Sequence, residues 1–208
     1  KKKKGKQEVL TVRDYLDLVE KDPRIAQNAH ARGEEIICGT NGELVEIVPE
    51  DERSTLGIDK VYPFFRNELF GVDQSIAQVV EHLVAGARRA SSGKQVLLLV
   101  GPPASGKSTL ARILKRGFEN YNARPVYQIA GCPKQEEPLH ALPRHLHQEI
   151  EEKLKIHIDG DLCPICRDTL KKFTDEDGVI RWWDVPVERF TFSIQGVRGI
   201  TSFEPSDE

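Results

Sequence analysis

The sequence predicts an α/β fold in which a parallel sheet is flanked by helices. Three observations lead to this prediction. The apolar run 96–100 has the length and composition of a buried strand. A glycine-rich turn and a helical pattern over about 107–118 follow it directly. A second candidate strand, 125–130, comes next, and a strand–helix–strand order is typical of a parallel sheet with a helical crossover.

The chain before this sheet is expected to form a separate, partly helical segment over residues 1–60. Within it, residues 11–21 are predicted to form a short amphipathic helix that Thr11 caps and Pro23 ends. Its apolar positions recur with helical spacing at Val12, Tyr15, Leu16 and Val19. Residues 35–38 and 44–48 are interpreted as two short strands around an Asn-Gly turn.

Residues 61–208 are expected to form the core of the fold. A helix is predicted from about residue 75 to 89, before the first strand of the sheet. After the second strand, residues 131–186 are predicted to be an insertion, with a helical stretch over 139–154 that is broken at Pro143. Residues 187–193 alternate apolar and polar side chains, which predicts a half-buried strand.

The turn after the first strand has the pattern G-x-x-x-x-G-K-S, which is typical of the phosphate-binding loop of nucleoside triphosphatases. Its glycines let the backbone wrap around an anion, and the helix that follows directs free amides at the phosphates. Lys107 is the predicted catalytic residue, because its ammonium would neutralise the β- and γ-phosphates of ATP, and the Ser108 hydroxyl is expected to bind Mg²⁺. The predicted nucleotide-binding residues are Gly101, Pro102, Pro103, Ala104, Ser105, Gly106, Lys107, Ser108 and Thr109.

Hydrolysis of a nucleotide also needs an acidic residue that holds Mg²⁺ through water. The nearest candidate, Asp159, ends the short run 156–159, and its place beside a cysteine turn favours an ordinary turn residue. The chain is therefore expected to bind nucleotide but to hydrolyse it poorly alone. It begins at a lysine and contains no methionine, so we also expect it to be a piece of a longer protein.

Cys163 and Cys166 have the spacing with which two thiolates of one turn bind a zinc ion. A structural zinc site needs four ligands, and no second C-x-x-C pair is present. Candidates to complete the site are Cys132, His140, His145, His147 and His157. Buried thiols without a metal and a redox-active pair are the alternatives.

The composition excludes several classes of function. An apolar fraction of 38% and a charged fraction of 30% are those of a soluble globular protein. A net charge of −3 gives no general signal for nucleic-acid binding. No apolar run approaches the roughly 20 residues of a membrane span, and no apolar segment follows the basic residues 1–6, so they are not expected to be a secretory signal. With only four cysteines, a reducing cytoplasmic location is expected.

Several short stretches occur in the order found in one family. These are residues 14–19 (DYLDLV), 29–32 (AHAR), 68–71 (ELFG), the phosphate loop, 131–133 (GCP), 137–140 (EPLH), 160–167 (GDLCPICR) and 203–207 (FEPSD). Together they resemble the AAA-type domain of the bacterial PrkA family, whose members are described as serine protein kinases. The resemblance covers most of residues 11–207.

The resemblance implies an AAA+ ATPase core that uses ATP and Mg²⁺ to phosphorylate a protein substrate, in stress or starvation physiology. It also implies a further C-terminal part that holds the second acidic motif. By analogy with AAA+ domains, Phe70, Gly71 and Val72 would line the adenine pocket, and subunits would assemble into a homo-oligomeric ring. An AAA+ motor for protein remodelling or Lon-like proteolysis, a small-molecule kinase, and a non-enzymatic nucleotide-gated binding module are the alternatives.

Overall fold

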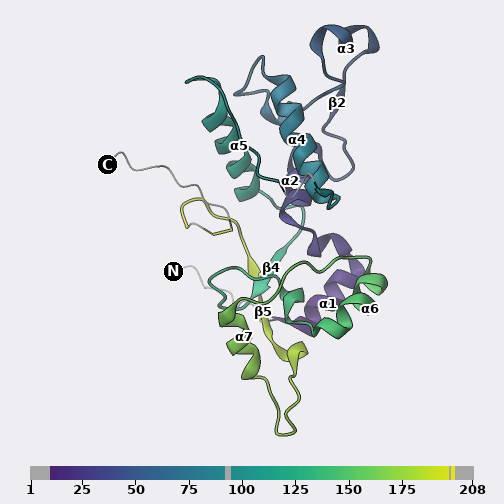
Figure 1. The fold of residues 1–208 in the computed structure, drawn as a ribbon, viewed down its shortest axis with the longest axis vertical. Coiled ribbons are helices and arrows are strands. Elements are labelled where there is room, and N and C mark those ends of the chain that lie inside the picture. The colour runs from purple at the N-terminus through teal and green to yellow at the C-terminus, as the bar shows by residue number, and fades with distance from the viewer. Residues whose placement is uncertain (1–9, 92–94, 197, 200–208) are drawn as a thin grey trace, which may run out of the picture. The chain divides into compact units, whose positions relative to one another are not determined.

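The structure is a computed structural model that describes residues 10–91, 95–196 and 198–199 (Figure 1). The described chain divides into two compact units, each with its own hydrophobic core. The first unit combines the residues up to Ala26 with Asn122–Thr191. The second combines Gln27–Tyr121 with the described residues from Phe192 onward. The predicted division at residue 60, with an insertion over 131–186, stays a prediction.

The first unit contains a three-stranded antiparallel sheet in which β5 lies between β1 and β4. The strands are β1 (Leu10–Thr11), β4 (Val126–Ile129) and β5 (Pro186–Phe190). The helices are α1 (Val12–Lys21), α6 (Arg144–Leu154) and α7 (Pro164–Lys171). Three 3₁₀ turns accompany them, at Pro23–Ala26, Pro138–Ala141 and Trp182–Asp184.

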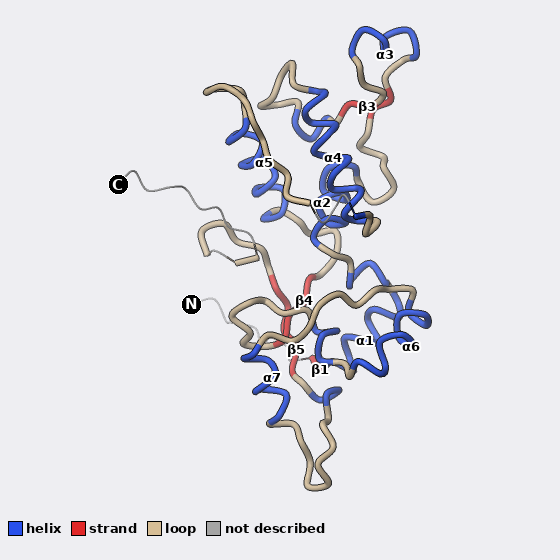
Figure 2. The backbone as a smooth tube through the Cα atoms, viewed as in Figure 1, coloured by secondary structure: helices blue, strands red, loops and turns tan. Residues whose placement is uncertain are grey.

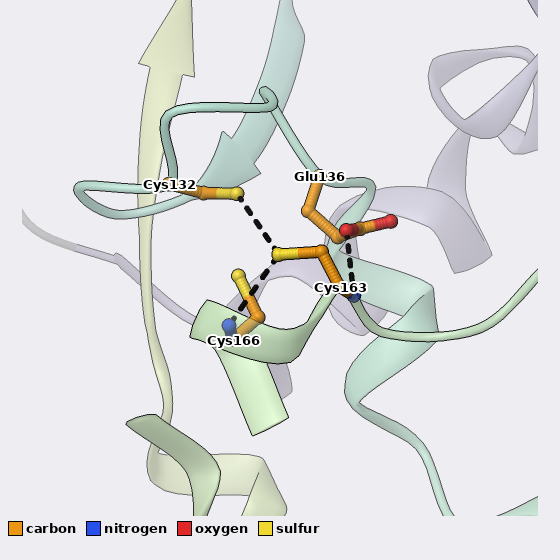
Figure 3. A group of neighbouring side chains, drawn as sticks. All are labelled: Cys132, Glu136, Cys163 and Cys166. Carbon is orange, nitrogen blue, oxygen red and sulfur yellow. Dashed lines mark hydrogen bonds between the residues drawn. The ribbon is translucent and has the colours of Figure 1, made fainter. Parts of the chain in front are cut away.

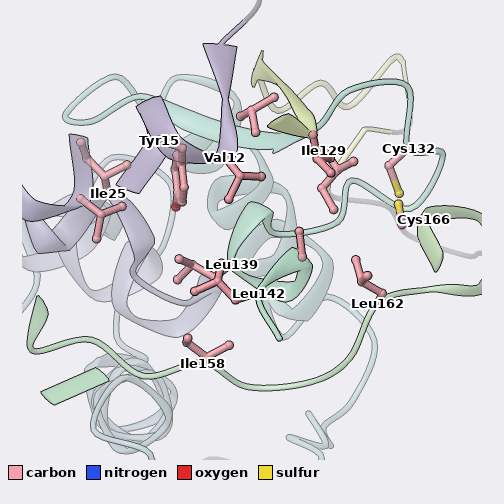
Figure 4. Close-up of a cluster of buried hydrophobic side chains, with 14 of the residues drawn as sticks. Val12, Tyr15, Ile25, Ile129, Cys132, Leu139, Leu142, Ile158, Leu162 and Cys166 are labelled. Atoms are coloured by element: carbon pink, nitrogen blue, oxygen red, sulfur yellow. The ribbon is translucent and has the colours of Figure 1, made fainter. Parts of the chain in front are cut away.

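The predicted N-terminal helix is present as α1, and it covers the core of the first unit with one face (Figure 4). Val12, Tyr15 and Val19 are at most 1% exposed, in agreement with their helical spacing. The Thr11 side chain accepts a hydrogen bond from the Asp14 amide, while the Asp14 carboxylate accepts one from the Thr11 amide. This capping box explains why the helix begins at Val12.

The second unit is mainly helical, with one two-stranded antiparallel sheet. Its helices are α2 (Ala29–Cys38), α3 (Glu50–Leu56), α4 (Asp73–Ala87) and α5 (Lys107–Glu119), with a 3₁₀ turn at Pro63–Phe65. Its strands are β2 (Glu46–Ile47) and β3 (Lys60–Val61). Gly86 lets α2 and α4 approach closely, because a Cβ atom there would lie 2.3 Å from Cδ2 of His30.

The predicted strand over 35–38 is wrong, because these residues form the last turn of α2. The Asn28 side chain caps this helix by accepting a hydrogen bond from the Ala31 amide at 2.8 Å. Packing of Ile37 in the core of the second unit outweighs the strand preference of its β-branched side chain. The expected strand over 44–48 is reduced to β2, which pairs with β3.

The predicted parallel sheet is not confirmed. Within the described residues, 95–100 form no strand (Figure 2). The side chains of Val96, Leu98 and Val100 are 93, 78 and 84% exposed. The second predicted strand is present as β4, but it pairs with β5 in an antiparallel manner. An apolar strand of this kind is stable when other strands pair with its edges and helices cover its faces. In the described part of the chain, no strand pairs with residues 95–100.

Across the described residues, no helix is both long and apolar enough to cross a membrane. The stretch 203–207, part of the family resemblance, lies outside the described residues.

Candidate nucleotide-binding site

The predicted phosphate loop ends at the N-terminus of α5, in the second unit. Gly106 forms the cap of this helix with φ +86°, a left-handed conformation that favours glycine. A Cβ atom at this position would also lie 2.8 Å from Cδ2 of Leu69. The first amides of a helix have no intrahelical acceptor, and the positive end of the helix dipole lies beside them. This end of α5 is therefore shaped to bind an anion.

Lys107 turns back over the loop that precedes it. Its Nζ atom donates hydrogen bonds to the carbonyl oxygens of Gly101 and Pro102, at 2.8 and 2.7 Å, and to Oγ of Ser105 at 2.9 Å. The ammonium group thus lies within the curve of the loop. Phosphate oxygens bound to the loop would replace these acceptors with more strongly charged ones.

Two cavities adjoin the loop. The larger, about 630 Å³, is lined by Glu68, Leu69, Phe70, Val72 and residues 103–109. The smaller, about 310 Å³, lies between apolar side chains of α4 and residues 97–102. These volumes are in the range of small-molecule sites. The structure thus brings Phe70 and Val72 to the loop, whereas Gly71 lines neither cavity.

Glu68 is the one carboxylate that lines these two cavities among the described residues. It forms an ion pair with Arg116, and Arg112 lies 3.7 Å from its second oxygen. Both arginines lie on α5, so Glu68 connects the turn before α4 to this helix beside the loop. Glu68 belongs to the family stretch 68–71, but no sequence pattern indicated a role for it.

Asp159, the nearest candidate for a second acidic residue, lies in the first unit. Residues 156–158 form no strand, and Oδ1 of Asp159 lies 3.1 Å from Nε2 of His157. The structure gives Asp159 the surroundings of a turn residue, as the sequence favours.

A second group of functional side chains lies in the first unit, where Cys132 joins Cys163 and Cys166 (Figure 3). Cys132 follows β4, and Cys163 caps α7. Their Sγ atoms are 3.8 Å apart, and the Cys166 amide donates a hydrogen bond to Sγ of Cys163 at 3.4 Å. All three thiols are free and buried.

Glu136 completes this cysteine cluster, with ligand atoms of all four residues within 4.8 Å of one another. Its carboxylate accepts a hydrogen bond from the Cys163 amide at 2.9 Å, and its other oxygen lies 2.6 Å from Nδ1 of His140. Burial acts to raise the pKa of Glu136, but these hydrogen bonds lower it below its usual value. No spacing in the sequence marked Glu136 as a member of the cluster.

Two of the other candidate histidines have different partners. Nε2 of His147 lies 3.0 Å from the carbonyl oxygen of Leu142, and His157 lies between Glu151 and Asp159. Of the four histidines considered from the sequence, His140 is the one that the structure connects to the cysteine cluster through a hydrogen bond.

Comparison with known proteins decides the family. A family model described as the PrkA AAA domain matches residues 10–208. This chain belongs to the PrkA AAA domain family. The resemblance found in the sequence is thereby confirmed, and the chain is an AAA-type domain with helices and small antiparallel sheets.

Two relatives of this PrkA AAA domain carry different names. The chain is 38% identical over 201 residues to the ATP-dependent protease PrkA of Bacillus subtilis, covering 95% of this chain and 30% of the relative. It is 33% identical over 116 residues to the serine/threonine kinase YeaG of Escherichia coli, covering 53% of this chain and 17% of that relative. The PrkA AAA domain thus spans less than a third of these relatives. No solved structure matches it significantly.

Proposed function

We propose that this chain binds ATP with Mg²⁺ and supplies the nucleotide-binding part of an ATP-dependent enzyme that acts on proteins. The observation that carries the proposal is the loop before α5, where Gly106 has a left-handed backbone and the Lys107 ammonium lies among loop acceptors. The helix amides, the lysine and the glycine together form a cradle for a polyphosphate. The family assignment supports ATP as the ligand.

Each group around the loop has a distinct role in this proposal. The Lys107 ammonium would leave its carbonyl partners and bind the β- and γ-phosphates, while the Ser108 hydroxyl would bind Mg²⁺. Phe70 and Val72 offer apolar surface beside the loop, against which the adenine ring would lie. Bound Mg²⁺ would neutralise charge that develops on the transferred phosphoryl group.

Two outputs for the bound nucleotide differ in where the γ-phosphate goes. In one, it is transferred to a serine or threonine of a protein substrate, in line with the name of the Escherichia coli relative. In the other, water takes it up and the released energy drives proteolysis, in line with the name of the Bacillus subtilis relative. We favour the second, because that relative matches 95% of this chain and a loop of this type commonly serves hydrolysis.

The test follows the γ-phosphate in the full-length protein. ATP labelled on the γ-phosphate is incubated with the protein and an unfolded acceptor such as casein. Release of label as free phosphate, together with ATP-dependent cleavage of casein, is the expected result. Label on serine or threonine of the acceptor without cleavage would contradict it and support the kinase reaction.

The Lys107→Ala variant supplies the control for either output. Loss of the charge-assisted contacts of this ammonium is expected to weaken ATP binding about 100-fold, which corresponds to about 2.7 kcal/mol. Lys115→Ala removes the same charge two turns further along α5 and should leave binding unchanged. Isothermal titration with ATP and Mg²⁺ measures both, and equal affinity of Lys107→Ala and the unmodified protein would contradict the assignment of the loop.

A further inference from the structure

The cysteine cluster of the first unit is separate from the nucleotide site in its chemistry. We infer that the thiolates of Cys132, Cys163 and Cys166, with the carboxylate of Glu136, bind one structural zinc ion. Thiolate and carboxylate ligands in a set of four are a donor set that zinc accepts. Neither the family description nor the names of the relatives assign a metal to these residues.

The spacing of the sulfur atoms fits a shared metal. Two thiolates bound tetrahedrally to one zinc, each at about 2.3 Å, lie about 3.8 Å apart. The Sγ atoms of Cys132 and Cys163 are 3.8 Å apart in the structure. A disulfide would need a separation of about 2.05 Å, and it would leave Cys166 and Glu136 without a role. The four ligand atoms lie within 4.8 Å of one another, so one ion can reach all of them with small rotations of the side chains.

The start of α7 brings two of the sulfur atoms to one point. Cys163 is the cap residue of α7 and Cys166 lies in its first turn, and a metal-bound thiolate there would lie at the positive end of the helix dipole. The Cys166 amide donates a hydrogen bond to Sγ of Cys163. Binding of Zn²⁺ would release the three thiol protons to solvent and leave all three sulfur atoms as ligands.

Glu136 is held in place as a fourth ligand by two contacts, one at each carboxylate oxygen. One carboxylate oxygen accepts from the Cys163 amide, and the other lies 2.6 Å from Nδ1 of His140. His140 therefore acts as a positioning residue that orients Glu136, as partners of metal ligands commonly do. Four protein ligands leave no open position for water, which makes the site structural and not catalytic.

The zinc would connect two parts of the first unit that are far apart in the sequence. Cys132 lies three residues after β4 of the antiparallel sheet, whereas Cys163 caps α7 and Cys166 lies in its first turn, 31 or more residues later in the chain. The ion would thus fix the segment between them, which contains α6, against the sheet. A shared zinc ion explains why the three cysteines lie together, whereas burial of separate thiols would not require them to be neighbours.

The first experiment measures zinc in the full-length protein, purified with a reductant and without chelator. Mass spectrometry of the metal content is expected to give one zinc per chain. Replacement by Co²⁺ is expected to give the intense near-ultraviolet absorption of thiolate-to-cobalt charge transfer. Protein that holds no zinc and binds neither added Zn²⁺ nor Co²⁺ would overturn the inference, as would a Cys132–Cys163 disulfide in the reduced preparation.

Variants then test the individual ligands by competition with a coloured zinc chelator. Cys166→Ser and Glu136→Gln should each weaken zinc affinity by at least about tenfold, and Cys166→Ser should also reduce the charge-transfer absorption. Cys38→Ser, which changes a buried free cysteine of the second unit, is the matched control and should bind zinc as the unmodified protein does. Unchanged affinity in Glu136→Gln would overturn its assignment as ligand. If a variant fails to fold, the chelator titration of the unmodified protein still measures its zinc affinity and so still tests whether the site binds zinc.

Discussion

At the scale of single residues, Gly106 shows how one backbone conformation shapes the nucleotide site. Its φ of +86° lets the chain turn into α5, and Leu69 occupies the space that a Cβ atom would need. Both effects act on the loop that carries Lys107. We therefore expect this glycine to matter for stability and for ATP binding together.

Gly106→Ala is predicted to weaken ATP binding and to lower the free energy of unfolding by more than the about 1–2 kcal/mol that the left-handed conformation alone costs, because the added Cβ atom would also meet Leu69. Gly42→Ala is the matched control, because Gly42 also has a positive φ of 78° but no atom lies within 4 Å of its Cβ position. Urea unfolding and ATP titration measure the two effects. Equal losses of stability in both variants, with ATP binding intact in Gly106→Ala, would mean that the contact with Leu69 does not shape the loop.

The residues of the candidate sites stay predictions, and the sequence indicated them only where chemistry leaves a local pattern. The phosphate loop is such a pattern, since its glycines, lysine and serine are consecutive. Cys163 and Cys166 are another. Glu136 was not predictable, because it joins the cysteines through a loop whose path only the fold determines. Glu68 was missed for a similar reason, since it lies in a turn and its arginine partners lie far along the chain on α5.

At the scale of elements, helices with a strong period and a clear cap were well predicted. The structure has α1 at Val12–Lys21, α4 at Asp73–Ala87 and α5 at Lys107–Glu119, each within a few residues of the expected range. The helix α2 was missed because its isoleucines favour a strand locally, whereas packing against α4 decides the outcome. Sheet pairing was the least predictable level, because partners far apart in sequence determine it.

The contact between α2 and α4 predicts a dependence of stability on pH. Burial lowers the pKa of His30 on α2, and the nearby ring of His82 on α4 lowers it further. The unfolded chain therefore takes up a proton at His30 more readily than the folded protein does. The stability that this histidine contributes is present above pH of about 6.5 and is lost as pH falls toward the lower folded pKa.

His30→Gln should accordingly reduce the loss of unfolding free energy between pH 7.5 and pH 5.0. Urea unfolding at both pH values measures this loss, and His145→Gln, on α6 of the first unit, is the matched control. If His30→Gln and the unmodified protein lost the same stability on acidification, the contact between α2 and α4 would not be the source of the effect.

At the scale of the whole molecule, the exposed run 96–100 is the largest departure from the predicted fold. Leu98 is 78% exposed although it lies beside the phosphate loop. The relatives are more than three times as long as the part matched here. We expect the remaining part of a longer protein to supply strands that pair with 96–100, which would restore the parallel sheet predicted from the sequence.

This expectation gives a prediction for Leu98→Ser. In the full-length protein the substitution should lower the free energy of unfolding by about 2–3 kcal/mol, as for a buried leucine. Leu44→Ser is the control, since Leu44 is a half-exposed leucine of the same unit and should cost less than about 0.5 kcal/mol. Amide hydrogen exchange of residues 96–100 should be slow in the full-length protein and fast in residues 1–208. Fast exchange in both would contradict the proposed pairing.

The order of segments in the first unit also has a consequence for the newly synthesised chain. Leu10 on β1 pairs with Val187 on β5, and most of the second unit, Gln27–Tyr121, lies between them in the sequence. On the ribosome, α2, α4 and α5 can therefore assemble before β5, the central strand of the sheet in the first unit, has been synthesised. Until then α1 cannot pack against this strand. At a synthesis rate of about 5–20 residues per second, the roughly 70 residues from Tyr121 to Phe190 take about 4–14 s. Until β5 and the turn at Trp182–Asp184 are made, Val12, Tyr15 and Val19 lack part of their native cover, so α1 is a segment that a nascent-chain chaperone could protect.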